Sequence, residues 1–215
     1  MNKIIVAVLV MLLMSSAWAT GVKSTIIKGS DYISTDVGVK YNYTRISVAL
    51  DDNIMDHKNG SQTIKVISCN ESKTKCSYFV EFTSASGAVI GSYKSTNIIK
   101  NGSVYNSIGN ASPSILFPAE IQLNKVIKYS SKYNGIDVNG SYKFVKQIDN
   151  VTVNKRVFNN CVELKGKSIS ILKNKDKISN SSTEIYCSGV GLVKEVFTSS
   201  NNSNIEYTLD SIEKT

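Results

Sequence analysis

The pattern that most constrains this chain is the recurrence of apolar side chains at every second position, because that spacing is typical of strands. Several runs place apolar residues on one face and polar residues on the other. Clear examples are Ile46, Val48 and Leu50; Tyr78, Val80 and Phe82; and Ile205, Tyr207 and Leu209. Long stripes with the helical period of about 3.6 residues are absent from the sequence. Many short strands with one polar face predict a mainly β protein built on an antiparallel sheet, with few or no helices.

Turn-forming residues separate these runs and mark where we expect the chain to reverse. Gly, Asn and Asp readily adopt the backbone conformations that tight hairpin turns require. The predicted turns fall at Lys58-Asn59-Gly60, Lys100-Asn101-Gly102, Asn134-Gly135, Asn139-Gly140 and Asp149-Asn150. Residues 119–126 could form a short helix, but the end of that segment reads more like the beginning of a strand.

The first 19 residues have the organisation of a secretory signal peptide. Lys3 supplies the positive charge, Ile4–Met14 is an uninterrupted apolar run, and Ala17-Trp18-Ala19 fits a cleavage site. The apolar run is shorter than the ~20 residues that a membrane-spanning helix needs. A lipoprotein signal would require Cys where Thr20 stands. We therefore expect cleavage after Ala19 and a soluble mature protein, periplasmic or secreted, without a transmembrane segment.

The 215 residues suit one domain with its own hydrophobic core. With 41% hydrophobic and 20% charged residues, the composition is that of a globular protein and not of a disordered one. We expect residues 20–215 to form a single β domain. A weak echo between 31–43 and 116–133 leaves open two sub-halves, with a boundary near the polar residues 110–115.

Four cysteines in an exported chain predict two disulfide bonds. Three pairings of Cys69, Cys76, Cys161 and Cys187 are possible. We favour Cys69–Cys76 and Cys161–Cys187, because each pair then lies within one local β unit. Cys69 and Cys76 flank a polar turn and can face each other across a hairpin. A zinc or redox site is disfavoured because the chain has no C-x-x-C spacing and one histidine, so the sequence predicts no metal or cofactor.

A glycine-rich bend interrupts the strand pattern near the C-terminus. Gly189 and Gly191 permit positive φ or close backbone approach, which fits a tight turn or bulge between two strands. A phosphate-binding loop is the alternative. It would need a third glycine and a following helix, or a Gly-Lys-Ser/Thr sequence, and the chain offers neither.

The same bend carries a resemblance to uncharacterised exported bacterial β-proteins, whose C-terminal signature is of the type YYAPGVGLVKE. The matching segment here is Tyr186-Cys187-Ser188-Gly189-Val190-Gly191-Leu192-Val193-Lys194-Glu195. Further similar elements in the same order are Asp31-Tyr32-Ile33, Leu116-Phe117-Pro118, Cys161-Val162-Glu163-Leu164 and Ile205-Glu206-Tyr207-Thr208-Leu209. The chain departs from the signature at Cys187, where Ala is common, and at Ser188, where Pro is usual. Because the Cys161 strand keeps its Cys, the resemblance also makes Cys187 a credible partner for it. It implies a curved antiparallel sheet or half-barrel, similar to lipoprotein carriers, and brings no catalytic residues.

Other candidate sites are weak. The acidic loop around His57 lacks the ligand pattern of a calcium loop, and no G-x-S-x-G accompanies the histidine. Glycoside hydrolases use a pair of carboxylates, and Glu81 with Glu163 is one pair that the sequence offers for this chemistry. The net charge of +8 arises from 25 basic against 17 acidic residues, with many lysines between 125 and 177. In an exported protein this charge favours solubility or anionic envelope surfaces over nucleic acid.

These observations lead to a hypothesis and two alternatives. The hypothesis is a non-enzymatic envelope protein whose curved sheet binds an apolar or amphipathic ligand, such as a lipid, or another envelope protein. One alternative is a secreted hydrolase, which requires two carboxylates facing each other in a cleft. The other is a secreted adhesion or virulence factor. The sequence leaves the ligand, the partner and the oligomeric state open.

Overall fold

The computed structural model describes residues 26–49, 59–133, 135–200 and 203–214, which form twelve strands and one short 3₁₀ helix. The elements are η1 (Gly29–Tyr32), β1 (Val39–Ala49), β2 (Gly60–Cys69), β3 (Lys75–Ser84), β4 (Val89–Lys100), β5 (Ser103–Ile108), β6 (Ser114–Phe117), β7 (Ile127–Tyr133), β8 (Ile136–Val153), β9 (Arg156–Ile171), β10 (Lys177–Cys187), β11 (Gly191–Ser199) and β12 (Ser203–Lys214). The expected signal peptide and His57 lie outside the described residues. The predicted antiparallel sheet is confirmed, and residues 119–126 form no helix.

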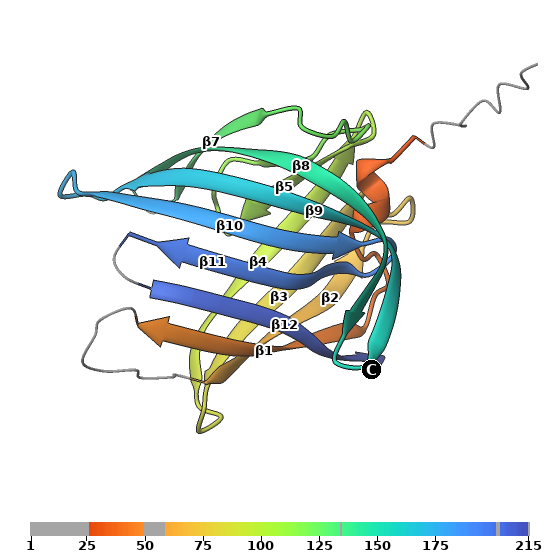
Figure 1. Cartoon of the computed structure of the whole chain (residues 1–215), viewed down its shortest axis with the longest axis horizontal. Helices are drawn as coiled ribbons and strands as arrows, with labels where there is room; N and C mark the ends of the chain where they lie inside the picture. Colours follow the sequence, from red (N-terminus) through yellow and green to blue (C-terminus); the bar gives the residue numbers. More distant parts are fainter. Residues whose placement is uncertain (1–25, 50–58, 134, 201–202, 215) are drawn as a thin grey trace, which may run out of the picture.

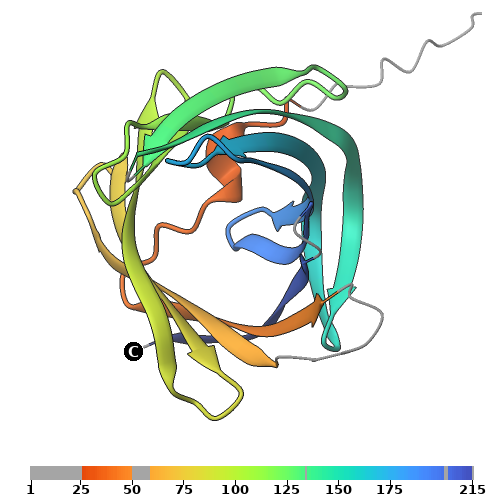
Figure 2. The same cartoon turned by 90° about the vertical axis from the view of Figure 1, so that its left-hand side faces the viewer.

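The sheet curls into a nearly closed barrel, seen from the side in Figure 1 and along its axis in Figure 2. Its strand order is β6-β5-β4-β3-β2-β1-β12-β11-β10-β9-β8-β7. Hairpins therefore join neighbours throughout, except where the first strand pairs with the last. That pairing runs antiparallel from Val39 opposite Lys214 to Ala49 opposite Ser203. Residues 110–113 lie between β5 and β6, whereas Ser114 and Ile115 belong to β6, and the two strands pair within this same sheet.

The two edges of the sheet, β6 and β7, meet at a seam that side chains hold together. The Tyr142 hydroxyl of β8 donates a hydrogen bond to the Ile115 carbonyl of β6 at 3.3 Å. The rings of Phe117 in β6 and Phe144 in β8 stack with centroids 5.7 Å apart. Both phenylalanines are fully buried. Aromatic packing thus joins the edges where the backbone ladder is interrupted.

The segment before β1 enters the barrel and covers one end of its interior (Figure 2). The Gly29 amide donates to the Ala119 carbonyl at 3.2 Å, and a Cβ at Gly29 would lie 2.1 Å from the Pro118 carbonyl oxygen. The Tyr32 ring is buried and stacks on Phe117. These contacts require glycine at position 29, because any side chain would displace the segment from the barrel wall.

The hairpin of β8 and β9 extends beyond the barrel and bends toward β12 (Figure 1). The Asn154 amide at its tip donates to the Leu209 carbonyl at 3.0 Å. At the base of this extension the Cys161–Cys187 disulfide joins β9 to β10, and the two cysteines lie directly opposite each other. Cys69–Cys76 joins β2 to β3 in the same way. The structure therefore contains the two pairs favoured from the sequence.

Two predicted turns are wrong, because Asn139-Gly140 and Asp149-Asn150 both lie inside β8. Gly140 is needed for packing, since a Cβ there would lie 2.5 Å from the Tyr129 ring and 2.8 Å from the Lys167 carbonyl oxygen. The hairpin reverses instead at Asn154 and Lys155, which have φ angles of 47° and 66°. Two consecutive left-handed residues are what a two-residue type I′ turn requires.

Candidate functional site

The interior of the barrel contains two adjoining cavities of about 250 Å³ and about 240 Å³. Asn106, Leu116 and Glu195 line both of them, so the cavities meet at these residues. Ligand pockets in proteins measure roughly 300–1,000 Å³, and the two cavities together fall within that range. The barrel interior is therefore the candidate site, and its shape follows from strand number. Eight strands enclose little more than packed side chains, whereas twelve strands enclose more space than side chains fill.

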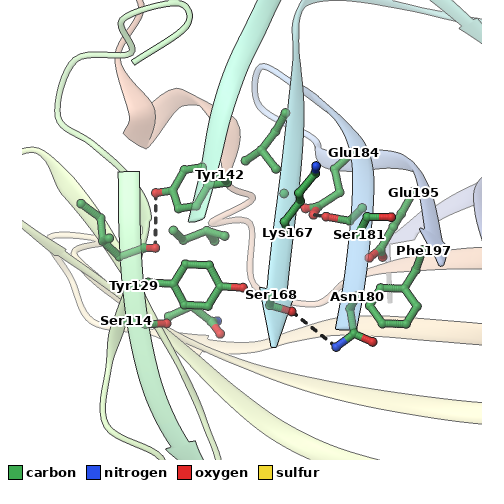
Figure 3. A pocket seen from close by; sticks show the side chains of 16 residues that line it. Ser114, Tyr129, Tyr142, Lys167, Ser168, Asn180, Ser181, Glu184, Glu195 and Phe197 are labelled. Carbon is green, nitrogen blue, oxygen red and sulfur yellow. Dashed lines mark hydrogen bonds between the residues drawn. The ribbon is translucent and has the colours of Figure 1, made fainter. Parts of the chain in front are cut away.

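The first cavity lies between the seam and β11 (Figure 3). Its wall combines hydroxyl and amide groups with the rings of Tyr129, Tyr142 and Phe197. Asn180 donates a hydrogen bond to Ser168 at 3.4 Å across neighbouring strands. A wall of this composition presents rings to an apolar group and hydrogen-bonding atoms to a polar one, so it suits an amphipathic molecule.

The second cavity lies beneath the N-terminal segment and is lined by tyrosines from β1, β3, β4 and β10. They are Tyr41, Tyr43, Tyr78, Tyr93 and Tyr186, joined by Tyr32 of η1. Burial raises the pKa of Tyr78 and of Tyr93 to about 12, so both hydroxyls are neutral near pH 7. Tyr43 donates to the Leu192 carbonyl at 2.9 Å. The hydroxyls of Tyr43 and Tyr78 are thereby fixed by defined partners, the latter by donating to the Ser34 carbonyl at 2.6 Å.

Gln62 is the unpaired polar group of this cavity. Its side chain on β2 is 7% exposed, and its Oε1 atom has no hydrogen-bond partner among the described residues. A buried amide oxygen without a donor costs about 1–3 kcal/mol in lost hydration. Gln62 lines the cavity together with Glu195, so a ligand donor in this space would satisfy the Gln62 oxygen.

Two glutamates face each other on neighbouring strands at the junction of the cavities (Figure 3). Glu184 on β10 lies directly opposite Glu195 on β11. Ser182 Oγ and the Tyr186 hydroxyl donate to the two carboxylate oxygens of Glu184 at 2.7 Å and 2.6 Å. Glu195 has no hydrogen bond or ion pair within the part of the chain that the structure describes. Burial, and then the neighbouring Glu184 charge, raise the pKa of Glu195 to about 8.

The row of residues continues across the sheet from this pair. Tyr207 on β12 lies opposite Glu195, and Arg45 on β1 lies opposite Tyr207. Burial raises the pKa of Tyr207, and the nearby Arg45 guanidinium offsets part of that rise. Arg45 lines neither cavity. The row therefore crosses four neighbouring strands on one face of the sheet, with Tyr207 between the carboxyl pair and the Arg45 cation.

The four cysteines lie outside the lining of both cavities. The segment that carries the resemblance contributes directly to the site, because its residues Tyr186, Val190, Gly191, Leu192 and Glu195 line the second cavity. Gly189 and Gly191 have φ angles of 73° and 95° and form the turn between β10 and β11. The Gly189 amide donates to the Asp31 carbonyl at 2.8 Å, so this turn holds the N-terminal segment in the barrel. Gly191 lines the second cavity.

The carboxylate pair named from the sequence is the wrong one. Glu81 on β3 and Glu163 on β9 belong to strands that are not neighbours in the sheet. Glu163 is neutralised by Lys146 at 3.0 Å and Lys165 at 3.6 Å. The pair at the site is Glu184 and Glu195. The hairpin turn at Gly189–Gly191 brings the two strands together, and a register shift between Ile185 and Tyr186 then places Glu184 opposite Glu195. The turn position was therefore only part of the signal that could have found them.

Neither a metal-binding cluster nor a membrane-spanning helix occurs in residues 26–49, 59–133, 135–200 and 203–214. Within these ranges no group of three or more His, Cys, Asp or Glu side chains is close enough to bind a metal ion together. The described part of the chain also contains no helix long and apolar enough to cross a lipid bilayer.

Comparison with solved structures shows that two bacterial proteins share this fold. No protein-family model and no curated protein sequence matches the chain. A candidate exported protein with a YmcC-like fold from Bacteroides fragilis superposes with a TM-score of 0.63 at 12% identity, covering 85% of this chain and 99% of that one. A candidate lipoprotein from Parabacteroides distasonis gives a TM-score of 0.62 at 14% identity, covering 85% and 98%. At these identities the similarity is one of fold, and it is shared along nearly the whole length of both neighbours.

Proposed function

We propose that this protein is an exported, non-enzymatic binding protein that holds a small amphipathic ligand inside its barrel. The observation that carries the proposal is the pair of joined cavities, whose wall mixes tyrosine rings with an unpaired, buried Gln62 oxygen. An empty cavity of this kind is costly, because buried polar groups lose water without gaining partners. A ligand with an apolar body would pack against the tyrosine rings, and its hydrogen-bond donors would pair with the Gln62 amide oxygen.

The compartment belongs to the same proposal. The first 19 residues have the pattern of a signal peptide, and we infer cleavage after Ala19 and a periplasmic or secreted location. Two disulfide bonds support an oxidising compartment. The two structural neighbours, an exported protein and a lipoprotein by their descriptions, support it as well. We also propose that the protein belongs to the group of exported bacterial β-proteins with the YYAPGVGLVKE-type signature.

The test compares two variants of β4 that differ in the face they alter. Ser95 is buried and lines the second cavity, whereas Ser92 lies on the same strand and is exposed. Ser95→Phe places a ring inside the cavity, and Ser92→Phe places the same ring outside. Binding of prodan, a small neutral amphipathic fluorophore, should weaken at least about tenfold in Ser95→Phe and stay unchanged in Ser92→Phe.

Native mass spectrometry of the protein purified from the periplasm extends this test to the natural ligand. We expect a bound molecule on the wild-type protein and on Ser92→Phe, and a lower occupancy on Ser95→Phe. If the wild type does not bind prodan, or if both variants bind it equally well, the barrel is not a ligand site. The remaining explanation would be a protein partner that contacts the outside of the sheet, as an adhesion factor would.

One observation favours the second candidate, a carboxylate-based hydrolase. Glu184 and Glu195 face each other in the cavity, and the raised pKa of Glu195 suits a general acid. Against this, both oxygens of Glu184 already accept hydrogen bonds, which lowers its capacity to act as a nucleophile or base. Hydrolysis of aryl glycosides by the wild type, abolished by Glu195→Gln, would establish this candidate in place of simple binding.

A further inference from the structure

The inference concerns the charge of the ligand and rests on the proposed binding function. Glu184 and Glu195 lie opposite each other where the two cavities meet, and none of the ion pairs between described residues includes either one. Elsewhere on the barrel some acidic residues do have cationic partners, as Glu206 does in Lys194 at 2.8 Å and Glu163 does in Lys146 at 3.0 Å. The protein thus carries an excess of basic residues, yet it leaves two carboxyl groups in its interior without a counter-charge.

The groups that face Glu195 come from four strands, and none of those at the cavity is a cation. They are Tyr43 on β1, Tyr93 on β4, Glu184 and Tyr186 on β10, and Tyr207 on β12, beyond which lies Arg45. The Glu195 carboxylate raises the pKa of each of these four tyrosines, which places it near all of them. Lys167 lines the first cavity but is an exposed residue with no ion pair to either glutamate among the described residues.

Gln62 gives the second, independent observation. Its Oε1 atom is a hydrogen-bond acceptor without a donor, and it lines the same cavity as Glu195 and three of those tyrosines. Two unmatched groups therefore face the second cavity as acceptors: the Gln62 amide oxygen and, when it is ionised, the Glu195 carboxyl group. The other buried atom without a partner among the described residues is a donor, Arg45 Nε, and Arg45 lines neither cavity. Tyrosine rings add attraction for a cation, worth about 0.5–2 kcal/mol for each well-placed ring.

We propose that the ligand is an organic cation, a protonated amine with an apolar body, whose ammonium group binds Glu195 at the junction of the cavities. The apolar body lies along the tyrosine rings, and Gln62 Oε1 accepts a further N–H or O–H of the ligand. Ammonium binding supplies the positive charge that the carboxyl pair lacks. A neutral ligand would leave Glu184 and Glu195 to share one proton, and an anionic ligand would be repelled by them.

The experiment uses three probes of equal length that differ in charge: n-octylammonium, n-octanol and n-octanoate. Isothermal titration calorimetry of the full mature protein measures each affinity. We expect octylammonium to bind at least about tenfold more tightly than the other two, and Glu195→Gln to remove that preference. Glu81→Gln is the matched control, because Glu81 is a strand glutamate that lines neither cavity. It should bind like the wild type.

The pH dependence of octylammonium binding is a second measurement, and a merely structural role of Glu195 would not produce the expected result. A cation binds the ionised carboxylate, so binding releases a proton wherever Glu195 is protonated in the empty protein. The affinity for octylammonium should rise several-fold per pH unit up to about pH 8 and then level off, because the pKa of Glu195 in the free protein is about 8. The affinity of the wild type for octanol should not change with pH. In Glu195→Gln the affinities for octylammonium and for octanol should both be independent of pH over this range.

The outcomes separate this inference from the proposed function. If octanol binds as tightly as octylammonium in wild type and in Glu195→Gln, the barrel is a binding site but the cation proposal is wrong. Preferential binding of octanoate would overturn it as well. If none of the three probes binds, the proposed binding function itself fails. If Glu195→Gln does not fold, Glu184→Gln takes its place in the test. This variant removes the other carboxylate of the pair, so it should also weaken the binding of octylammonium.

Discussion

The two disulfide bonds should differ in what they contribute to stability, because they close loops of different length. Cys161–Cys187 spans a sequence separation of 26 residues, and Cys69–Cys76 spans 7. In the chain-entropy model a cross-link restricts the unfolded chain more when the loop it closes is longer. At 25 °C this gives about 3.5 kcal/mol for the 26-residue separation and about 2.4 kcal/mol for the 7-residue one.

The surroundings of the longer link add to this difference. Both Cys161 and Cys187 are fully buried, and they pack with Val193 and Leu209 under the extension of β8 and β9. Replacing both by alanine removes two buried sulfur atoms, whereas at the other link Cys69 is only half-buried. We therefore expect the double variant at 161 and 187 to lose at least about 1 kcal/mol more than the double variant at 69 and 76.

Equilibrium unfolding in urea, followed by far-UV circular dichroism, measures the two losses. In thermal unfolding of a domain of this size, 1 kcal/mol corresponds to roughly 2–4 °C in Tm. Loss of the longer link should therefore lower Tm by about 7–14 °C. The slope of the free energy of unfolding against urea should be compared as well, because disulfide removal changes the unfolded state. An equal or larger loss at Cys69–Cys76 would show that loop closure does not govern these links, and the reasoning would be refuted.

Two further predictions concern backbone packing and pH. Gly140→Ala should destabilise the barrel by about 1–3 kcal/mol in urea unfolding, because its Cβ would lie 2.5 Å from the Tyr129 ring. Gly189→Ala, which meets nothing within 4 Å but has φ of 73°, should lose only about 1 kcal/mol, and the reverse order would contradict this reading. Because the folded-state pKa of Glu195 is raised, the folded protein holds a proton that the unfolded chain has already released between about pH 4.5 and 8. Stability should therefore fall as pH rises through that window, by at most about 1.4 kcal/mol per pH unit, and Glu195→Gln should abolish this part of the slope.

The sheet was predictable from the sequence because its signal is local. Alternation and tight turns specify strands and hairpins one at a time, and a barrel of consecutive hairpins needs little else. The turns that failed show the limit of this reasoning. Gly140 resembles a turn residue in the sequence, but its role is to let the Tyr129 ring approach β8 closely. Only the neighbouring strand makes that role visible, and the neighbour is not specified by local pattern.

The closure of the sheet was less predictable than its strands. Pairing of β1 with β12 joins residues that lie far apart in sequence, as Asn42 with Ser211 shows through a 2.8 Å hydrogen bond across a separation of 169 positions. Nothing in either strand alone selects the other. The N-terminal segment is a similar case, because Tyr32 reads as an isolated aromatic residue until Phe117 provides the ring on which it stacks.

The site was the least predictable part of the structure. When both faces of a strand carry a mixture of polar and apolar residues, the sequence does not indicate which face points into the barrel. On β10 the inward positions hold Ser182, Glu184 and Tyr186, and the alternate positions hold Thr183 and Ile185. By hydrophobicity alone Ile185 should be the interior residue. The polar face becomes the interior here because the barrel has space that its side chains do not fill.

The same fact explains why an uncompensated carboxyl pair can persist in this protein. In a filled core Glu184 and Glu195 would have no room to be solvated, and selection for stability would replace them by apolar residues. In a barrel of twelve strands the interior is wide enough to admit another molecule, so its lining can be selected for what it holds. The N-terminal segment, fixed by the Asp31 carbonyl and the Gly189 amide, then separates this lining from solvent at one end. Strand number sets the size of the interior, and the residues on β10 and β11 set its charge, so the two properties of the site vary independently in a fold of this kind.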